Sequence, residues 1–167
     1  MMKKLTLMTA GFLLLQPCLA SDNFTLYLVR HAEKQADSKN PPLTRCGKAR
    51  ARQLATLLST VNIKSIYSTS YQRTMSTAAP LAKQQHIAIK QYNPKQLNQF
   101  ALHLKQDRKN ALIVGHSNTT PQLTQLLSEQ KVADLSENDY QNLYQVQFIE
   151  DKSQLTLLKQ PLACKQH

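Results

Sequence analysis

Apolar residues along the chain follow two alternating patterns. Short runs rich in β-branched and aromatic residues predict buried strands, and the stretches between them repeat apolar residues at the three- and four-residue spacing of a helix face. Strands are expected at residues 24–30, 63–69, 87–92 and 111–115, with a helix after each of them. Two further strands, at about 143–149 and 154–158, would surround a turn at residues 150–152.

Capping residues predict where the expected helices begin. Thr44 is expected to cap the first helix, at about residues 44–59, and Ser70 to cap the second, which Pro80 should kink or restart. Asn93 is expected at the N-cap of the third helix, with the proline after it in the first turn.

The alternation of strand and helix, repeated four times with short connections, predicts an α/β protein. We expect a three-layer α/β/α sandwich, with helices on both faces of a mainly parallel sheet and an antiparallel C-terminal strand. In such sheets ligands bind beyond the carboxyl ends of the strands. The residues that directly follow strands are therefore the first candidates for a functional site.

Length and composition exclude several classes of protein. A chain of 167 residues suits one domain, and three glycines cannot supply the clustered glycines of a dinucleotide-binding or Walker phosphate loop. The sequence has no H-E-x-x-H or C-x-x-C motif, so nothing in it supports a metal site.

The first twenty residues resemble a secretory signal peptide. Lys3 and Lys4 precede an apolar run at residues 5–15, and small residues follow it. We expect cleavage after Ala20, which leaves one domain at residues 21–167 in the periplasm. The apolar run is shorter than the roughly 20 residues that span a bilayer, so we expect no stable membrane insertion after cleavage.

Two cysteines, Cys46 and Cys164, remain once the signal peptide is removed. Thiols tend to pair in an oxidising compartment, so these two residues are a candidate disulfide. Two free buried thiols are the alternative, because the sequence does not show the distance between them.

The charge of the chain is basic and unevenly spread. Lys and Arg outnumber Asp and Glu by 21 to 10, and no acidic residue lies between Asp37 and Asp107. We expect a basic side that attracts polyanions, with a generally solvated basic surface as the plainer alternative. Nucleic acid is not expected as a partner, because the chain has no Trp and only four Phe for stacking on bases.

Basic side chains follow three of the expected strands. Arg30 and His31 follow the first strand, Arg73 comes soon after the second, and His116 follows the fourth. An arginine presents a fork of donors that matches a phosphate, and an imidazole can be a nucleophile or a proton carrier. Taken singly, Arg73 could be a solvated charge and His116 a helix cap. Together they predict a site for a tetrahedral dianion such as a phosphoryl group.

Four blocks of sequence carry a family resemblance, at residues 28–34, 42–51, 68–78 and 114–119. In this order and at this spacing they resemble the histidine phosphatase superfamily, which has the phosphoglycerate-mutase-like fold. The resemblance covers about residues 24–128. It suggests a small, exported, single-domain member.

The resemblance implies roles for the residues that follow the strands. His31 would be the nucleophile and form a phosphohistidine that water then hydrolyses. Arg30, Arg73 and His116, with Ser117, would bind the phosphoryl oxygens and stabilise the charge of the transition state. Neither a metal nor another cofactor takes part in that scheme.

Two departures from the family pattern affect the expected chemistry. Ala32 replaces the glycine of the signature and adds a methyl group close to the expected phosphate pocket. The usual positions of the carboxylate that protonates the leaving group lack one, since Ser117 follows the second histidine and Asp107 lies at the wrong end of a strand. Glu33 is the nearest candidate acid, unless it pairs with a neighbouring base. The acidic segment at 129–139 is a further candidate.

These observations predict an exported, monomeric phosphatase that hydrolyses a phosphomonoester or phosphoanhydride. Its substrate would be a phosphorylated small molecule or an envelope glycolipid, such as one carrying lipopolysaccharide core phosphates. If no acid is present, a leaving group that departs without help, such as pyrophosphate, is favoured. The alternative is a catalytically weak module that keeps the pocket and binds phosphate or a polyanion without turnover.

Overall fold

The computed structural model describes residues 23–36, 38–150, 152–161 and 164. The expected signal peptide, residues 1–20, lies outside the described residues. None of the helices within the described ranges is long and apolar enough to cross a membrane.

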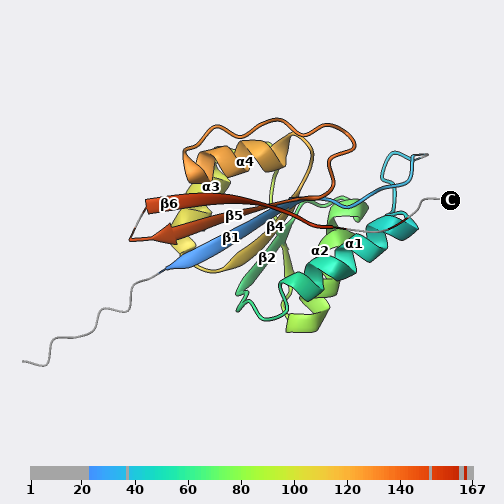
Figure 1. Ribbon diagram of the computed structural model, residues 1–167, viewed down its shortest axis with the longest axis horizontal. Coiled ribbons are helices and arrows are strands. Elements are labelled where there is room, and N and C mark those ends of the chain that lie inside the picture. Colours follow the sequence, from blue (N-terminus) through green and yellow to red (C-terminus); the bar gives the residue numbers. More distant parts are fainter. Residues whose placement is uncertain (1–22, 37, 151, 162–163, 165–167) are drawn as a thin grey trace, which may run out of the picture.

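One mixed sheet lies at the centre of the molecule (Figure 1). Its strands are β1 (Phe24–Arg30), β2 (Ser65–Ser68), β3 (Ile89–Gln91), β4 (Ala111–Gly115), β5 (Asn142–Ile149) and β6 (Lys152–Lys159). Their order across the sheet is β3-β2-β4-β1-β5-β6, with β1 to β4 parallel to one another. Strand β5 runs antiparallel to its neighbours β1 and β6. The expected mainly parallel sheet with an antiparallel C-terminal strand is confirmed.

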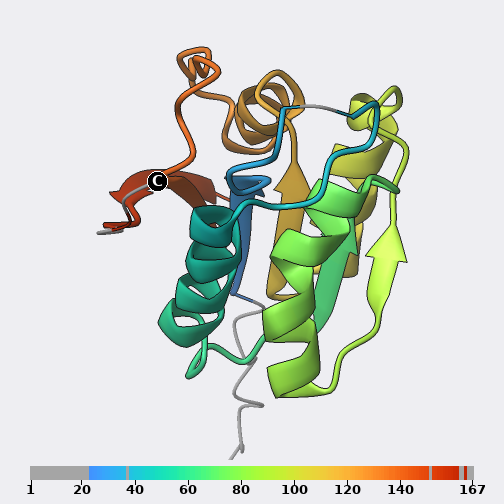
Figure 2. The same cartoon turned by 90° about the vertical axis from the view of Figure 1, so that its right-hand side faces the viewer.

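Helices cover both faces of this sheet. They are α1 (Arg45–Leu57), α2 (Gln72–Gln85), α3 (Leu97–Asp107) and α4 (Thr119–Ser128). Helices α1 and α2 pack against each other on one face, and α3 and α4 pack together on the other (Figures 1 and 2). The expected three-layer α/β/α sandwich is therefore confirmed.

Each face of the sheet has its own apolar core, because successive side chains of a strand point to opposite faces. Leu28 in β1 and Ile113 in β4 belong to the core beneath α3 and α4. Their neighbours Val29 and Val114 belong to the core beneath α1 and α2. Burial on both faces explains why β1 and β4 are nearly continuous apolar runs in the sequence.

Two of the expected helix caps are wrong. Ser70 does not cap α2, whose N-cap residue is Tyr71 and has no side-chain capping bond. Asn93 does not cap α3, because its Oδ1 accepts a hydrogen bond from the backbone N–H of Lys95 within a turn, and the N-cap residue is Gln96. Ser and Asn form such local turns as readily as caps, so a cap signal can fall a few residues early.

The expected cap of α1 is present, and α2 does not restart at Pro80. Thr44 Oγ1 accepts a hydrogen bond from the backbone N–H of Gly47, 3.0 Å away. Pro80 lies inside α2, which continues to Gln85. The buried residues Ala78 and Leu81 hold this part of α2 against the sheet, and we attribute the continuation of the helix to that packing.

Gly47 allows α1 to approach the segment that follows β1. A Cβ atom on Gly47 would lie 2.1 Å from the carbonyl oxygen of Glu33, a distance that the backbone cannot accommodate. The same carbonyl accepts a hydrogen bond from the backbone N–H of Thr44, 2.9 Å away. The glycine therefore sets the position of α1 next to the residues that follow His31.

A disulfide joins Cys46 in α1 to Cys164 beyond β6, with 5.7 Å between the two Cα atoms. The structure thus contains the pairing that the cysteine count suggested. Arg50 Nη1 also donates to the carbonyl oxygen of Gln160, 3.1 Å away. The segment after β6 is therefore attached to α1 both covalently and by a hydrogen bond.

Candidate active site

The carboxyl ends of the parallel strands bring the expected basic residues together. Arg30 ends β1, His31 follows it, and His116 follows β4. Because Arg30 is in register with Gly115 on the neighbouring strand, the two histidine rings lie side by side, with centroids 5.8 Å apart. Arg73 comes from the first turn of α2. In Figure 2 the arrowheads of β3 and β4 point to this edge of the sheet.

These residues line an open pocket of about 400 Å³. Most of its charged residues are basic, and Glu137 is the one carboxylate among the described lining residues. The lining consists of Arg30, His31, Lys34, Tyr71, Arg73, Pro94, Lys95, His116, Ser117, Asn118, Thr119 and Glu137. A pocket with this excess of positive charge attracts an anion.

The ring of His31 is oriented by a backbone hydrogen bond. Its Nδ1 lies 2.8 Å from the carbonyl oxygen of Ala32. Since a carbonyl can only accept, Nδ1 carries the hydrogen and Nε2 keeps its lone pair. Burial, together with the positive charges of Arg30 and Arg73, lowers the pKa of His31 to about 3. The imidazole is therefore neutral near pH 7, as a nitrogen nucleophile must be.

The second histidine is held by two partners. His116 Nε2 lies 3.0 Å from Thr69 Oγ1, and its Nδ1 lies 3.4 Å from Arg73 Nη2. A guanidinium only donates, so Nδ1 accepts and Nε2 carries the hydrogen. Burial, with Arg73 and Arg30 nearby, lowers the pKa of His116 to about 4.

Each arginine of the pocket lies under a tyrosine ring. The guanidinium carbon of Arg30 is 4.3 Å from the centroid of the Tyr140 ring, and that of Arg73 is 4.3 Å from the Tyr71 ring. Such stacking is a favourable cation–π arrangement. The Nε atoms of both arginines are buried and have no hydrogen-bond partner among the described residues. The two guanidinium groups are thus held in place with donor capacity remaining for a ligand.

The chemistry of this donor set is that of an oxyanion site. Two arginines and two imidazole rings line the pocket, and the described residues contain no group of three or more His, Cys, Asp or Glu that could hold a metal ion. A phosphoryl group has the charge and the tetrahedral oxygens that such donors bind. The arrangement supports binding of phosphate next to a neutral imidazole.

Solved phosphatase structures share this fold. The protein histidine phosphatase SixA complexed with tungstate is 12% identical, with a TM-score of 0.67 over 81% of this chain and 96% of that chain. The alpha-ribazole phosphatase from Shigella flexneri is 16% identical, with a TM-score of 0.67 over 85% of this chain and 100% of that chain. The mycobacterial glucosyl-3-phosphoglycerate phosphatase is 10% identical, with a TM-score of 0.63 over 84% of this chain and 100% of that chain. No curated protein sequence matches the chain.

A sequence model of a protein family matches the part of the chain that contains three of the site residues. The model of the histidine phosphatase superfamily (branch 1) matches residues 26–94, which contain Arg30, His31 and Arg73. Over these residues the chain is similar to the histidine phosphatase superfamily. His116 lies outside the matched segment, and the fold places it beside His31.

The structure brings five expected site residues into one pocket. Arg30, His31, Arg73, His116 and Ser117 all line it. The other lining residues were not among the expected site residues. Lysine, tyrosine and proline at the pocket rim come from loops whose course a strand pattern does not predict.

Glu33 is not at the position expected for an acid of the pocket. Its carboxylate accepts hydrogen bonds from Arg50, at 3.0 Å from Nε and 2.6 Å from Nη2. The pair is largely buried, with each side chain 11% exposed. The expectation that Glu33 acts as the proton donor is therefore wrong, because an arginine of α1 holds its carboxylate outside the pocket lining. Its alternative role, pairing with a base, is the observed one.

Ala32 lies next to His31, as expected, and its carbonyl oxygen is the one that orients the His31 ring. Its side chain is fully buried with Leu43 and Ala51 in a small apolar cluster, and Ala32 is not among the pocket-lining residues. The methyl group that replaces the family glycine is therefore accommodated by packing against α1.

We expect Arg50→Ala to lower the free energy of unfolding of the protein by about 3 kcal/mol, because it leaves the buried carboxylate of Glu33 unpaired. Urea denaturation would measure the loss. Arg52→Ala, an exposed neighbour in the same helix, is the matched control and should cost much less. Equal losses in the two variants would contradict the buried pair as the cause.

The lowered pKa values of the two histidines make stability depend on pH. Below about pH 6.5 the unfolded chain protonates His31 and His116, whereas the folded protein does not until about pH 4 and below. The unfolded state therefore binds more protons, and we expect the free energy of unfolding to fall by about 4 kcal/mol between pH 7 and pH 5, about 2 kcal/mol from each histidine. Urea denaturation in phosphate-free buffer measures this. The double variant His31→Asn/His116→Asn should lose less over the same range, and an equal loss would refute the assignment.

Proposed function

We propose that this chain is a metal-independent phosphatase that works through a phosphohistidine at His31. The observation that carries the proposal is the neutral His31 ring, whose hydrogen is on Nδ1 and whose Nε2 lone pair is free, in a pocket with one buried and one half-buried arginine. The solved phosphatases of the same fold support it, one of them complexed with tungstate, a tetrahedral oxyanion like phosphate.

In the proposed reaction Nε2 of His31 attacks the phosphorus of a bound monoester. The N–P bond forms while the bond to the leaving oxygen breaks. Arg30 and Arg73 donate hydrogen bonds to the equatorial oxygens and stabilise the charge that builds up on them. His116 becomes a third donor when the negative charge of the bound dianion favours a proton on its Nδ1. Water then attacks the phosphohistidine, releases phosphate and restores the neutral imidazole.

Hydrolysis of p-nitrophenyl phosphate, with and without a chelator, tests the proposal. Its phenolate leaves readily, so weak protonation of the leaving group would not hide activity. Turnover that resists the chelator supports a metal-independent phosphatase. Phosphate binding without turnover would overturn the proposal and favour a binding module that retains the pocket.

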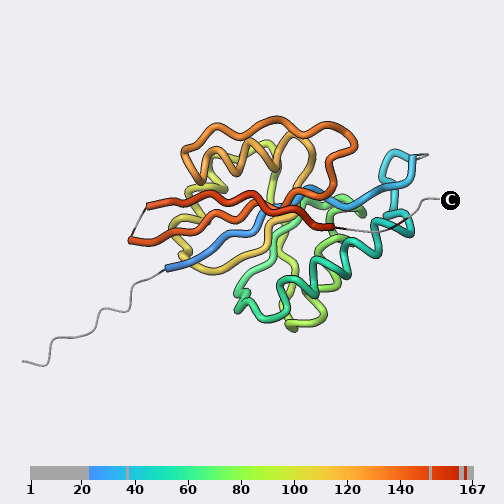
Figure 3. Tube along the Cα trace, viewed as in Figure 1, coloured from blue at the N-terminus to red at the C-terminus, as the bar shows by residue number. Residues whose placement is uncertain are grey.

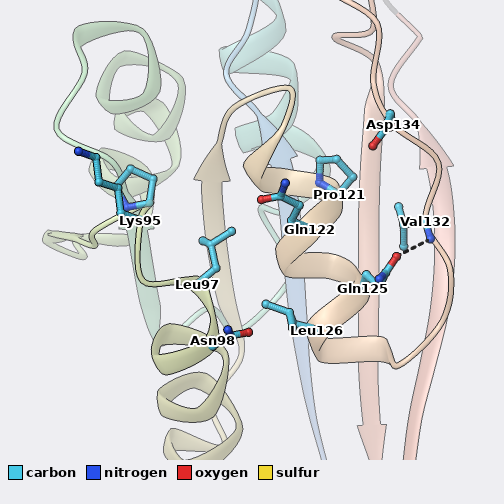
Figure 4. A pocket seen from close by; sticks show the side chains of 10 residues that line it. Lys95, Leu97, Asn98, Pro121, Gln122, Gln125, Leu126, Val132 and Asp134 are labelled. Atoms are coloured by element: carbon cyan, nitrogen blue, oxygen red, sulfur yellow. Dashed lines mark hydrogen bonds between the residues drawn. The ribbon is translucent and has the colours of Figure 1, made fainter.

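We further propose that the protein acts as a monomer in the periplasm, after removal of residues 1–20, on an envelope polyanion such as lipopolysaccharide core phosphate. Two grooves on the surface favour the proposal of a large anionic substrate. Helices α1 and α2 contain no acidic residue, and Lys48, Arg52 and Lys83 surround a groove between them. A second groove, of about 380 Å³, adjoins the active site (Figure 4).

The groove of Figure 4 offers room for the part of a substrate that lies beyond the phosphoryl group. It shares Pro94 and Lys95 with the active-site pocket. Gln122 and Gln125 of α4 add amide groups to its wall, and Asp134 adds a carboxylate. Amides and a lysine suit a hydroxyl-rich group with additional negative charge.

Phosphate release from purified lipopolysaccharide tests the substrate proposal. The wild-type protein should release phosphate, and Lys95→Ala should lose more of this activity than of its activity on p-nitrophenyl phosphate. Lys64→Ala, an exposed lysine that precedes β2 at the opposite edge of the sheet, is the matched control. Active enzyme that releases no phosphate from lipopolysaccharide would rule out this substrate and leave the phosphatase proposal intact.

A further inference from the structure

A carboxylate reaches the active site from the segment between α4 and β5. Glu137 lies in this segment, and Figure 3 shows the segment passing along α4 before it turns down toward the end of β1. Glu137 Oε2 accepts a hydrogen bond from Arg30 Nη2, 2.8 Å away, and Oε1 accepts one from Ser117 Oγ, 3.0 Å away. The carboxylate thus joins two residues of the phosphate pocket.

Neighbouring residues fix this segment to the same arginine. The carbonyl oxygen of Ser136 accepts a hydrogen bond from Arg30 Nη1, 2.8 Å away, and the ring of Tyr140 stacks on the guanidinium. Asp139 Oδ2 accepts from the backbone N–H of Ser136, 2.8 Å away. Contacts of the residues before and after Glu137 therefore fix its backbone in place, although its own side chain is 74% exposed.

An alkoxide leaving group needs a proton when its bond to phosphorus breaks. Among the described residues that line the pocket, Glu137 is the one carboxyl group. His31 is occupied as the nucleophile, and His116 and the arginines hold phosphoryl oxygens. Glu137 also contacts Ser117, the residue directly after His116, and its exposed side chain lies at the rim of the pocket.

We propose that Glu137 donates the proton to the leaving group and then accepts a proton from the water that attacks the phosphohistidine. This inference rests on the proposed function. In the first step the N–P bond forms, the P–O bond breaks and the leaving oxygen takes the proton of the Glu137 carboxyl. In the second step water gives its proton to the carboxylate, its oxygen bonds to phosphorus, and the N–P bond breaks.

Substrate binding supplies the protonated form of Glu137. In the free protein the hydrogen bond from Ser117 and the charge of Arg30 hold the pKa of Glu137 below its usual range, with Lys34 adding to the effect. Arg73 and Tyr140 also face this carboxylate. A bound phosphate dianion takes over the donors of Arg30 and adds negative charge beside the carboxylate. Both changes raise its pKa and favour uptake of a proton.

The leaving-group dependence of Glu137→Gln tests the proposal. On glycerol 2-phosphate, whose alkoxide leaves poorly, we expect kcat to fall by about 100- to 1,000-fold. On p-nitrophenyl phosphate, whose phenolate needs little help, the loss should be far smaller. Glu129→Gln, at the start of the same segment, is the matched control and should behave like the wild type on both substrates. Thermal unfolding of the variants verifies that they are folded.

Two outcomes would overturn the assignment. Equal losses on the two substrates would mean that Glu137 only holds Arg30 in place. A lower inhibition constant for inorganic phosphate, with kcat undiminished on both substrates, would mean that the carboxylate competes with phosphate for Arg30. Inactivity of the wild type on p-nitrophenyl phosphate would refute the proposed phosphatase function itself, which distinguishes the two failures.

Discussion

Replacement of His31 by alanine is expected to lower kcat on p-nitrophenyl phosphate by about 10,000-fold or more, since it removes the atom that forms the covalent intermediate. Arg30, Arg73 and His116 remain in the variant, so phosphate should still bind. The residual rate would then come from substrate binding and charge stabilisation alone. Steady-state kinetics on the wild type and the variant measure the effect.

A trapped intermediate separates this loss from a general failure of the site. Rapid quenching of the wild type with labelled substrate should yield a phosphoryl group that is stable in base and labile in acid, as a phosphohistidine is. The His31→Ala variant should yield none. His103→Ala is the matched control, because His103 is exposed and lies outside the pocket lining. A label that persists in the His31→Ala variant would show that another residue is the nucleophile.

Loss of the disulfide should have the largest effect on stability. The bond between Cys46 and Cys164 spans 118 residues. In the loop-entropy model a closure of this length contributes about 4 to 5 kcal/mol, since it restricts the unfolded chain. The double variant Cys46→Ser/Cys164→Ser should therefore lose about that much free energy of unfolding, which corresponds to a Tm lower by roughly 10 to 15 °C for a domain of this size.

Reduction of the wild type provides an independent measurement of the same quantity. A thiol reductant should lower the Tm of the wild type toward that of the double variant and leave the Tm of the variant unchanged. The folded variant should retain turnover, because neither cysteine lines the pocket. A double variant as stable as the oxidised wild type would show that the bond contributes little.

The principal site residues could be predicted from the sequence because their positions follow from a general property of parallel sheets. Arg30 ends β1, His31 follows it, and His116 follows β4. Parallel strands end at the same edge of the sheet, so these residues lie together whatever conformation the loops adopt. The burial of β1 and β4 on both faces made these strands recognisable as apolar runs. The sequence did not show the order of the strands, and it is this order that puts β1 next to β4 and the two histidines side by side.

The carboxylates could not be assigned from the sequence in this way. Glu33 is close to His31 in the chain, but the partner that holds it, Arg50, lies on α1, whose packing depends on Gly47. Glu137 is far from His31 in the chain and reaches the pocket on an irregular segment. Proximity in sequence favoured the wrong carboxylate, because side-chain partners are set by tertiary packing rather than by spacing.

Because β1 lies between β4 and β5, the pocket can form only after these later strands have paired with β1. The strand synthesised first pairs with strands from the second half of the chain, and such long-range pairings form late in folding. A nascent chain that ends before β4 contains Arg30 and His31 but lacks His116, and it cannot surround a phosphoryl group. Recovery of enzyme activity during refolding would therefore report assembly of the central sheet rather than formation of any local segment.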